Sequence, residues 1–372
     1  MNSISYHKKY KGKIGTELKS PIDNRSDLSL AYTPGVAEVS LELFKNPKSA
    51  SMLSLKNNTI AVISDGSAVL GLGNIGAFGA IPVMEGKAAL FKKFANVDAF
   101  PICLTTQDNE EIIKIVKSIS PVFGGINLED IEAPRCFEIE KRLVGELDIP
   151  VMHDDQHGTA VVVLAALINA LKVVKKGKNV EIIINGSGAA GTAVTDLLLQ
   201  YGFKNIVVCD SKGAIFTNRP DLNREKKELS KKTNKQFEKG NIHQLIRNKY
   251  VFIGLSKGNL INKSDVMLMK KGSIIFAMAN PTPEILPEEA KLGGARIVAT
   301  GRSDFNNQIN NVLAFPGIFR GALDNKVRKI TDKMLILAAV NLSKLVKKPT
   351  AEKIIPNPFE KGIVGAVASA IK

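Results

Sequence analysis

The sequence predicts an α/β protein with two parallel-sheet domains and a helical C-terminal segment that packs back across both. Short apolar runs of strand length alternate with helical patterns, which is typical of βαβ units and a parallel sheet. A glycine-rich turn, Gly186–Gly191, joins one such strand to a helix. The chain has 372 residues, 44% of them hydrophobic and 23% charged, so it is long enough to form two cores of ordinary globular composition.

The first domain is predicted to span residues 1–155 and to hold the first series of elements. Each predicted strand is a short apolar or β-branched run bounded by polar residues or glycine. The expected strands are residues 59–64, 97–105, 122–126 and 149–153, and the expected helices are residues 86–94 and 109–119. A longer apolar helix, 159–174, follows this series. The alternation predicts a parallel sheet in the first domain.

A second series of elements predicts the second domain, residues 156–335. The series begins after the Lys-rich turn 175–179, the strongest break in the pattern. The expected strands are residues 180–184, 206–209, 251–254, 273–277 and 296–299, with a helix at 189–200 and a charged helix or loop at 226–239. From about residue 326 the pattern is helical and partly amphipathic, and residues 336–372 are predicted to form the segment that packs back.

The net charge of +15 comes from 51 basic and 36 acidic residues. One interpretation is a nucleic-acid or anionic-membrane partner. The other is a Lys-rich surface around a site that handles an anion. Lysines are spread along the whole chain, and no recognition-helix or RNA-binding pattern is present. We therefore predict no nucleic-acid partner and favour electrostatic steering of an acidic metabolite.

No segment predicts export or a membrane span. Residues 1–19 are polar and Lys-rich, without the apolar core of a signal peptide. The longest apolar runs, such as 160–168, are too short to span a bilayer. The three cysteines, Cys103, Cys136 and Cys209, form no C-x-x-C pair, which argues against a disulfide framework and structural zinc. We expect a cytoplasmic protein with no membrane partner.

The turn Gly186-Ser-Gly188-Ala189-Ala190-Gly191 has the G-x-G-x-x-G pattern of a dinucleotide site, with a strand before it and a helix after it. Gly186 permits the tight turn, Gly188 lets the backbone approach a pyrophosphate, and Gly191 lets the helix pack on the sheet. Backbone N–H groups at the helix start, including those of Ala189 and Ala190, favour phosphate. The pattern predicts a Rossmann-type NAD(P)-binding domain. The alternative is a glycine-rich turn without a ligand.

An acidic residue ends the next strand: Asp210, 19 residues after Gly191. A carboxylate at that position hydrogen-bonds the ribose 2′-hydroxyl of NAD and repels the 2′-phosphate of NADP. Lys212 lies two residues further on and offers a phosphate contact instead. We therefore favour NAD as the cofactor and expect NADP to be used as well.

Two pairs of adjacent acids follow predicted strands: Glu129-Asp130 and Asp154-Asp155. Ligands collect at the carboxyl ends of strands in open α/β sheets. Hard oxygen ligands from two such loops suit Mg²⁺ or Mn²⁺. The alternative is that Asp155 or Thr159 simply caps the helix that follows.

Six motifs in order resemble those of the malic enzyme family in its short bacterial form. The resemblance runs from about residue 32 to residue 324, most of the chain. The motifs are Tyr32–Ala37 (YTPGVA), Ser64–Gly76 (SDGSAVLGLGNIG), Pro82–Phe91 (PVMEGKAALF), Met152–Thr159 (MHDDQHGT), Asn280–Glu284 (NPTPE) and Asn310–Gly317 (NNVLAFPG). The resemblance implies an N-terminal domain for substrate and metal, a Rossmann-type NAD(P)-binding domain, and metal-dependent oxidative decarboxylation of L-malate to pyruvate and CO₂.

The resemblance also implies roles for individual residues. The implied ligands of Mn²⁺ or Mg²⁺ are Glu129, Asp130 and Asp155. Lys87 is the implied base at the malate hydroxyl, with Asp154 beside it to tune its pKa. Tyr32 is the implied acid that protonates the enol carbon. The implied binding residues for substrate or cofactor are Asn280, Asn310 and Asn311.

The catalytic roles of Tyr32 and Lys87 depend on the family resemblance. By pattern alone, Tyr32 is an ordinary aromatic residue beside Pro34, and Lys87 is a surface lysine on a helix. A base must be neutral to accept a proton. We therefore expect burial and neighbouring positive potential to lower the pKa of Lys87 toward about 7–8.

Three further features bear on the resemblance. Larger malic enzymes carry a substrate-binding arginine where this chain has Ala68. The identity of the group that binds the second malate carboxylate therefore stays open. Arg302 and nearby backbone N–H groups are the candidates. The second G-x-G-x-x-G, Gly71–Gly76, lacks a clean strand-to-helix context and is interpreted as a loop beside the substrate. His153 and His157 are interpreted as structural, or as support for the acids between them.

Three other functions are alternatives to malate oxidation. A metal-dependent oxaloacetate decarboxylase needs no dinucleotide site. A different Rossmann-fold dehydrogenase does not explain the two acidic pairs, and a non-enzymatic nucleotide sensor does not need the catalytic residues. The resemblance further implies a homodimer, with residues 1–55 as the contact. Whether Tyr32 serves its own subunit or the neighbouring one stays open.

Overall fold

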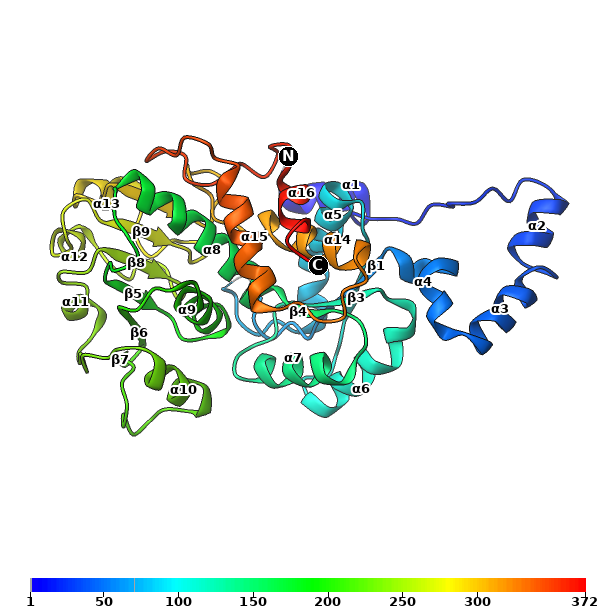
Figure 1. Ribbon diagram of the computed structural model, residues 1–372, viewed down its shortest axis with the longest axis horizontal. Helices are drawn as coiled ribbons and strands as arrows, with labels where there is room; N and C mark the ends of the chain where they lie inside the picture. Colours follow the sequence, from blue (N-terminus) through cyan, green and yellow to red (C-terminus); the bar gives the residue numbers. More distant parts are fainter. Residues whose placement is uncertain (1, 70) are drawn as a thin grey trace.

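The computed structural model describes residues 2–69 and 71–372, which form two sheets with helices packed around them (Figure 1). The first sheet is parallel, with the order β2-β1-β3-β4. Its strands are β1 (Thr59–Ser64), β2 (Asp98–Cys103), β3 (Gly125–Leu128) and β4 (Val151–His153). β1 is central and entirely buried. Its run TIAVIS is continuously apolar at its centre because Ile60 and Val62 face one core while Ala61 and Ile63 face another.

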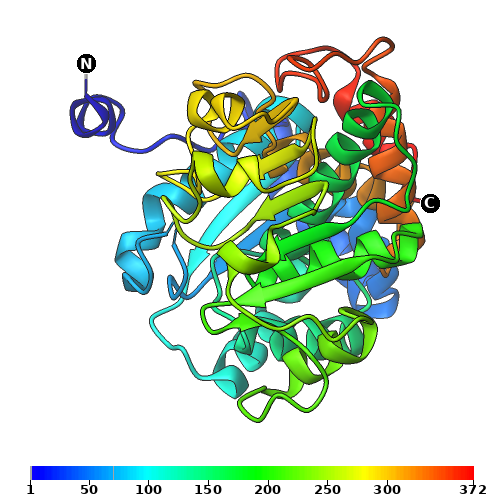
Figure 2. The same cartoon turned by 90° about the vertical axis from the view of Figure 1, so that its left-hand side faces the viewer.

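Figure 2 shows the strands of the second sheet side by side, in green and yellow. The strand order of this sheet is β10-β9-β8-β5-β6-β7, and β7 is antiparallel to β6. Its strands are β5 (Ile182–Asn185), β6 (Ile206–Asp210), β7 (Gly213–Ala214), β8 (Val251–Gly254), β9 (Ile274–Ala277) and β10 (Ile297–Thr300). The chain builds outward from β5 to β6 and then returns to β8 on the other side of β5. This reversal of strand order opens a crevice at the carboxyl end of β5, where ligands bind in such sheets.

Helix α8 (Asp154–Val173) connects the two sheets and is buried along most of its length. It packs against α9 (Ala189–Tyr201) and α15 (Asp332–Lys344). A helix that is apolar on all sides is stable in a protein interior. Among the described residues, α8 is the one helix long and apolar enough to cross a membrane, and 72% of that apolar stretch is buried inside the protein. Core helices commonly meet the same criterion.

The C-terminal helices pack across both halves of the molecule. Helix α14 (Phe315–Asp324) packs on α5 (Gly76–Ala95) and on α16 (Ile363–Ala368), whereas α15 packs on α8 and α9. The ring of Phe91 on α5 contacts those of Phe315 and Phe319, with centroid distances of 4.7 and 5.5 Å. The predicted packing back is therefore confirmed. The prediction of a helical tail is wrong between α15 and α16. Three prolines, which have no N–H donor, interrupt the helix there.

The N-terminal segment forms an arm. Its helices are α1 (Ser3–Tyr10), α2 (Arg25–Ala31), α3 (Val36–Lys45) and α4 (Ala50–Leu53). Figure 1 shows α2 and α3 projecting away from the body, and neither helix has a buried residue. Leu30 is 75% exposed and Phe44 84% exposed. The arm therefore presents apolar side chains that this single chain does not cover.

The remaining elements complete the two halves. The helices are α6 (Asn109–Ile119), α7 (Arg135–Glu146), α10 (Arg224–Lys232), α11 (Ile242–Leu245), α12 (Lys263–Met267) and α13 (Pro287–Leu292), and the 3₁₀ turns are η1 (Pro47–Ser49), η2 (Leu55–Asn57), η3 (Ser120–Val122) and η4 (Asn311–Leu313). Helices α6 and α7 cover the face of the first sheet opposite α5. Each half thus has helices on both faces of its sheet.

Some of the predicted ends of helices and strands are wrong. Helix α5 begins ten residues before the predicted start at residue 86, because its packing on β2 outweighs the glycines and Pro82 in its first half. Strand β3 begins at Gly125, since residues 120–122 form a 3₁₀ turn. The predicted domain boundaries at 155/156 and 335/336 stay predictions, and they lie within the helices α8 and α15. Local pattern does not mark these boundaries, because both helices are continuous through them.

Asn169 ties the C-terminal segment to α8. It is fully buried, and its Nδ2 donates hydrogen bonds to the carbonyls of Ser343 (2.8 Å) and Ile354 (2.9 Å). Asn169→Ala removes two buried hydrogen bonds and leaves the Ile354 carbonyl without a donor, while the Ser343 carbonyl keeps the N–H of Val346 at 3.3 Å. We therefore expect the free energy of unfolding to fall by about 2–3 kcal/mol. Urea denaturation measures the change. Asn341→Ala is the matched control, because its Nδ2 makes two longer bonds of 3.2 Å nearer the surface. Equal losses in the two variants contradict this account.

Candidate active site

Strands β3 and β4 bring the acidic pairs together. The two strands are parallel neighbours with Leu128 opposite His153, so the residues that follow them meet at one edge of the sheet. Carboxylate oxygens of Glu129, Asp130 and Asp155 all lie within 4.8 Å of one another. The structure thus places the three predicted metal ligands in one cluster.

Local hydrogen bonds hold the cluster in place. The backbone N–H of Asp130 donates to Asp155 Oδ2 at 2.9 Å, and Asn127 Nδ2 donates to Glu129 Oε2 at 2.8 Å. Asp130 has a φ of 52°, in the left-handed region that aspartate adopts more readily than most residues. Its Oδ2 is buried and has no hydrogen-bond partner in the part of the chain that the structure describes. The N-cap of α8 is His153, which makes no side-chain cap. Simple capping by Asp155 or Thr159 is therefore wrong.

Lys87 reaches the cluster from α5. Its side chain is buried, and Nζ lies 2.6 Å from Asp154 Oδ2 and 2.8 Å from Glu129 Oε1. Nζ also lies 4.2 Å from the centroid of the Phe315 ring, at a distance typical of a cation–π contact. The helix that was predicted to expose Lys87 instead turns it inward, because α5 packs on β1 and β2 on one side and on α14 on the other.

The acids control the protonation of Lys87. Burial disfavours its ammonium form, but the charges of Asp154 and Glu129 outweigh burial and hold the pKa of Lys87 above its ordinary value. The expected lowering is therefore wrong for this arrangement, because the potential around Nζ is negative rather than positive. Burial also raises the pKa of Asp154 to about 7, against the opposing effect of Lys87. Lys87 and Asp154 thus form a short proton path in which the carboxyl titrates near neutral pH.

The three predicted ligand acids are buried close together, which disfavours their ionised forms. Burial, reinforced by the charges of Asp155 and Glu129, raises the pKa of Asp130 to about 9. Burial also raises the pKa of Asp155 to about 6 and shifts the pKa of Glu129 upward. Three carboxylates so close together repel one another when ionised. The cluster is therefore poised to take up positive charge.

A buried glutamate supports the turn between β4 and α8. Glu140 of α7 accepts hydrogen bonds from the backbone N–H of His153 (2.6 Å) and from Gln156 Nε2 (3.0 Å). His157 Nε2 also lies 3.2 Å from its carboxylate. Both ring nitrogens of the buried His153 lack a hydrogen-bond partner among the described residues. The two histidines therefore lie behind the acids, as structural support.

The glycine turn at the carboxyl end of β5 has the close approaches that its pattern predicts. A Cβ at Gly186 would lie 2.4 Å from the carbonyl oxygen of Leu255, and one at Gly191 would lie 1.8 Å from that of Gly186. A Cβ at Gly188 would meet nothing within 4 Å, so the backbone there borders open space. Ala189 packs against the core of the first half. The glycine turn therefore borders open space at Gly188, beside the core of the first half.

Asp210 lies at the end of β6, as predicted, but it is paired with cations that the sequence pattern did not single out. Arg219 Nη1 donates to its Oδ1 at 2.9 Å, and Lys226 Nζ donates to its Oδ2 at 2.7 Å. The backbone N–H of Lys212 also donates to Oδ1 at 2.9 Å, whereas the Lys212 ammonium pairs with Asp221. Despite burial, these bonds lower the pKa of Asp210 to about 2. Asp210 is thus a fixed carboxylate.

The predicted asparagines have different surroundings. Asn311 lies beside the first turns of α8, where its Cβ is 3.2 Å from the position that a Cβ on Gly158 would take. Asn280 lies against the loop of the second glycine motif, since a Cβ at Gly71 would come within 2.4 Å of the Asn280 carbonyl oxygen. Asn310 Oδ1 accepts the N–H of Val312 and so caps η4. The oxygen of Asn310 is therefore occupied within its own turn.

Arg302 and the second glycine motif also have clear positions. Arg302 pairs with Asp304 and donates to the carbonyl of Pro281 at 2.9 Å, so its guanidinium is held at the surface. The glycine motif ends at Gly76, where α5 begins, and follows β1 through an extended loop. It therefore leads into a helix but does not follow directly from a strand, as predicted, and its place beside the substrate stays a prediction.

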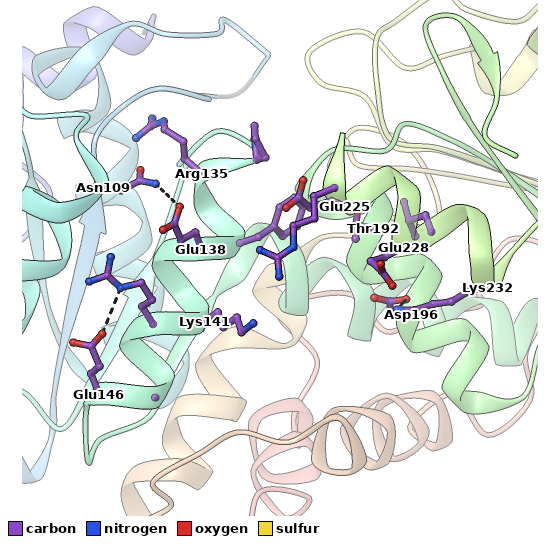
Figure 3. A pocket seen from close by; sticks show the side chains of 16 residues that line it. Asn109, Arg135, Glu138, Lys141, Glu146, Thr192, Asp196, Glu225, Glu228 and Lys232 are labelled. Atoms are coloured by element: carbon purple, nitrogen blue, oxygen red, sulfur yellow. Dashed lines mark hydrogen bonds and ion pairs between the residues drawn. The ribbon is translucent and has the colours of Figure 1, made fainter. Parts of the chain in front are cut away.

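A groove of about 780 Å³ separates the two halves beside the cofactor turn (Figure 3). Glu138 and Lys141 of α7 line one side, and Glu225 and Glu228 of α10 line the other. Thr192, next to the last glycine of the turn, also borders it. Charged walls of both signs favour a solvent-filled groove, and such an arrangement permits one half to close on the other.

Two family profiles match the chain in sequence order. The profile described as "Malic enzyme, N-terminal domain" matches residues 11–144, and the profile described as "Malic enzyme, NAD binding domain" matches residues 156–361. The chain belongs to the malic enzyme family. This assignment confirms the resemblance of the motifs and the α/β fold with an NAD(P)-binding domain.

Named relatives of this malic enzyme extend over most of the chain. It is 51% identical to the bifunctional malic/malolactic enzyme of Bacillus subtilis, over 99% of this chain and 91% of that protein. It is 54% identical to the NAD-dependent malic enzyme of Geobacillus stearothermophilus, over 97% of this chain and 76% of that protein. An NADP-dependent malic enzyme of Halomonas elongata is 40% identical, over 99% and 92% of the two chains. The crystal structure of the NAD-dependent malic enzyme of Thermotoga maritima has a TM-score of 0.97 at 48% identity, covering 100% of this chain and 99% of that one.

Sequence patterns missed several residues that shape the site of this malic enzyme. A Cβ at Gly158 would lie 1.8 Å from Asp154 Oδ1, so only glycine leaves space for that carboxylate. Asn127 has a recognisable signal, because it lies in β3 two residues before Glu129, which follows the strand, and alternation along an extended chain places the two side chains on the same side. Phe315 and Arg219 carry no comparable local signal. Both contact the predicted residues only through the tertiary fold.

Tyr32 is the predicted catalytic residue that the structure does not bring to the others. It follows α2 on the projecting arm and is 67% exposed, whereas Lys87 is buried within the body. In Figure 1 the arm carrying Tyr32 is separated from α5. Among residues 2–69 and 71–372 of one chain, Tyr32 therefore does not lie beside Lys87.

Proposed function

We propose that this malic enzyme oxidises L-malate at C2 and decarboxylates the product to pyruvate at the junction of its two halves. The observation that carries the proposal is the buried contact of Lys87 with Asp154 and Glu129 beside the glycine turn of a dinucleotide site. The family assignment supports malate as the substrate and NAD or NADP as the cofactor.

The acid cluster fits a divalent cation. Glu129, Asp130 and Asp155 offer hard oxygen atoms within 4.8 Å of one another, and one of these carboxylates has a buried oxygen without a partner. Mg²⁺ and Mn²⁺ are cations that prefer such ligands. We assign the three acids as the ligands. Burial and mutual repulsion raise the pKa values of these acids, and the charge of a bound dication would oppose both effects.

The proton from the malate hydroxyl goes to Lys87. Lys87 gives up its own proton only when positive charge at the acid cluster offsets the carboxylates that hold its pKa above the ordinary value, and Asp154 Oδ2, 2.6 Å from Nζ, is then the nearest acceptor. Lys87 is then neutral and accepts the C2 hydroxyl proton as a general base. Asp154 therefore acts on the substrate only through Lys87.

Bound NAD(P) supplies a hydride acceptor for C2, and a bound cation supplies Lewis-acid stabilisation of negative charge on the substrate oxygens. The C3–C4 bond then breaks and CO₂ leaves. Tyr32 donates its phenolic proton to C3, which yields pyruvate. Asn280 and Asn311, at the contact between the halves, are assigned to hold a substrate carboxylate or the cofactor.

We propose that the working unit is a homodimer in which the arm of one chain brings Tyr32 to the site of the other. Tyr32 is exposed on an arm that leaves its own body, and the arm presents apolar side chains such as Leu30 and Phe44. A two-fold dimer buries both arms and completes both sites at once. We place the enzyme in a reducing, cytoplasmic compartment, supported by the free thiols of Cys103, Cys136 and Cys209.

The reaction is tested with protein stripped of metal by a chelator. With L-malate present, NAD(P) reduction is expected only after Mn²⁺ or Mg²⁺ is restored, with pyruvate formed in equal amount. Asp155→Asn is expected to lower kcat/KM by about 100-fold or more, because one cation ligand is lost. Reduced-nicotinamide absorbance and a pyruvate assay measure both. Metal-dependent loss of added oxaloacetate without reduction of either cofactor contradicts the proposal and identifies a decarboxylase.

A further inference from the structure

We propose that Glu284 is a positioning residue of this enzyme: its buried carboxylate joins the loops that follow β8 and β9, and so fixes Asn280 at the substrate site. The inference rests on the proposed function and deepens it, because it names the residue through which Asn280 is held in place. Glu284 is the last residue of the motif Asn280–Glu284, and the sequence predicts no role for it.

The ends of β8 and β9 present backbone groups that a side chain can bind. The two strands are parallel neighbours, and their ladder ends where the N–H of Met278 donates to the carbonyl of Gly254 at 3.1 Å. Beyond this point both strands pass into loops. The N–H groups of Ser256 and Ala279 donate to the two different oxygens of Glu284, at 3.2 and 3.0 Å. One carboxylate therefore joins the two loops where the ladder ends.

The fold shapes a space for this carboxylate. Glu284 is fully buried, and a Cβ at Gly254 would lie 2.3 Å from its Cδ, so a glycine at the end of β8 leaves the room that the side chain needs. The backbone carbonyl of Glu284 also accepts the N–H groups of Leu260 and Ile261, at 2.9 and 3.1 Å. The loop after β8 is thus bound to both the side chain and the backbone of this residue.

The burial of this acid carries a free-energy penalty. The partners of its carboxylate are backbone N–H groups rather than a cation. Burial therefore raises the pKa of Glu284 to about 7, against the lowering effect of these N–H groups. An apolar side chain of similar size is buried without this penalty, but it offers no acceptor. What glutamate supplies here is two acceptors on one side chain, which hold two loops in one arrangement.

The bridge extends from the strand of the glycine turn to Asn280. Asn185 is the last residue of β5, and its Nδ2 donates to Ser256 Oγ at 2.7 Å. Ser256 is joined to Ala279 through Glu284, and Asn280 is the next residue along the chain. The loop that carries Asn280 is therefore anchored to the same strand that leads into the glycine turn.

Asn280 lies where a small displacement changes its relation to both halves. A Cβ at Gly301, just after β10, would lie 2.7 Å from Asn280 Nδ2, and a Cβ at Gly71 would lie 2.4 Å from the Asn280 carbonyl oxygen. Asn280 thus lies between the end of the second sheet and the loop that follows β1. A displacement of about 1 Å in a group that orients the substrate lowers a rate about 100-fold.

The test is a double-mutant cycle of Glu284→Gln with Asn280→Ala. Glutamine keeps the size of the side chain, but its NH₂ group faces one of the two N–H groups and leaves that group without an acceptor. We expect each single variant to lower kcat/KM for L-malate about 30-fold. If Glu284 acts through Asn280, the double variant differs from Asn280→Ala by less than about twofold. Losses that multiply in the double variant, or the absence of a loss in either single variant, overturn the inference.

Asn169→Ala is the matched control for stability. It also removes two buried hydrogen bonds to backbone groups, and its partners, Ser343 and Ile354, do not belong to this bridge. We expect it to lower Tm as Glu284→Gln does, but to keep the wild-type kcat/KM at temperatures where both variants are folded. An equal loss of kcat/KM in Asn169→Ala assigns the effect of Glu284→Gln to stability alone and contradicts a positioning role.

Amide hydrogen exchange gives a second readout that does not depend on turnover. The amides of Ser256 and Ala279 are expected to exchange about tenfold faster in Glu284→Gln than in the wild type, and at close to the wild-type rate in Asn169→Ala. Unchanged exchange of these amides in Glu284→Gln also overturns the inference. Faster exchange there, in a protein whose wild type does not oxidise malate, instead sets aside the proposed function alone.

Discussion

Mixing two inactive variants, Tyr32→Phe and Lys87→Arg, is expected to restore about a quarter of wild-type malate oxidation. Tyr32→Phe removes the acid on the arm. Lys87→Arg keeps a cation beside Asp154 and Glu129, but an arginine does not lose its proton and cannot act as the base. Random exchange of subunits makes half of the dimers mixed, and one of the two sites in each mixed dimer then has both native residues. The rate of NAD(P) reduction after exchange measures the recovery.

The matched control places both substitutions on one chain. If the arm works across the dimer, each mixed dimer of wild type with the double variant has two defective sites. An excess of the double variant is therefore expected to suppress wild-type activity. If Tyr32 serves its own chain, mixing the single variants restores nothing and the double variant does not inhibit. These two results together contradict the exchange of arms, and unchanged thermal unfolding of each variant confirms that its fold is intact.

Asp130→Asn is expected to abolish metal-dependent activity while stabilising the metal-free protein by about 1 kcal/mol. A carboxylate oxygen of Asp130 lies within 4.8 Å of carboxylate oxygens of Glu129 and Asp155. Its Oδ2 is buried and has no hydrogen-bond partner among the described residues, and its backbone φ is 52°. Asparagine removes the repulsion and also adopts left-handed backbone readily. The same change removes a charged ligand, so the rise in Tm on adding Mn²⁺ is expected to disappear.

Glu132→Gln is the matched control for that prediction. Glu132 lies two residues further along the same loop, its side chain is 49% exposed, and it pairs with Arg135 rather than with the cluster. Its neutralisation changes the net charge of the protein equally. We expect it to keep the activity and the Mn²⁺ response, and to give no gain in metal-free stability. A variant Asp130→Asn that retains its Mn²⁺ response, or that unfolds more easily without metal, contradicts the assignment of Asp130 as a ligand.

Patterns that depend on neighbouring residues predicted much of this protein. The bounds of β1 follow from six residues that are buried on both faces, and the glycine turn follows from spacing that only a strand-to-helix junction explains. Glu129 and Asp155 were paired correctly because each follows a strand, and parallel strands end at the same edge. Where local signals conflict, the prediction failed. The first half of α5 contains glycines and Pro82, yet it is helical because its packing on β2 stabilises it.

The sequence by itself determined the order of strands and helices, the glycine turn after β5 and the acidic residues that follow β3 and β4, because these depend on periodicity and on residues a few positions apart. Only the tertiary structure decided the charge on Lys87, the clamp of Arg219 on Asp210 and the position of Tyr32 outside its own body. A pKa depends on every charge within a few ångströms, wherever those charges lie along the chain. Lys87 and Asp154 are 67 residues apart in sequence, and folding alone brings them to 2.6 Å.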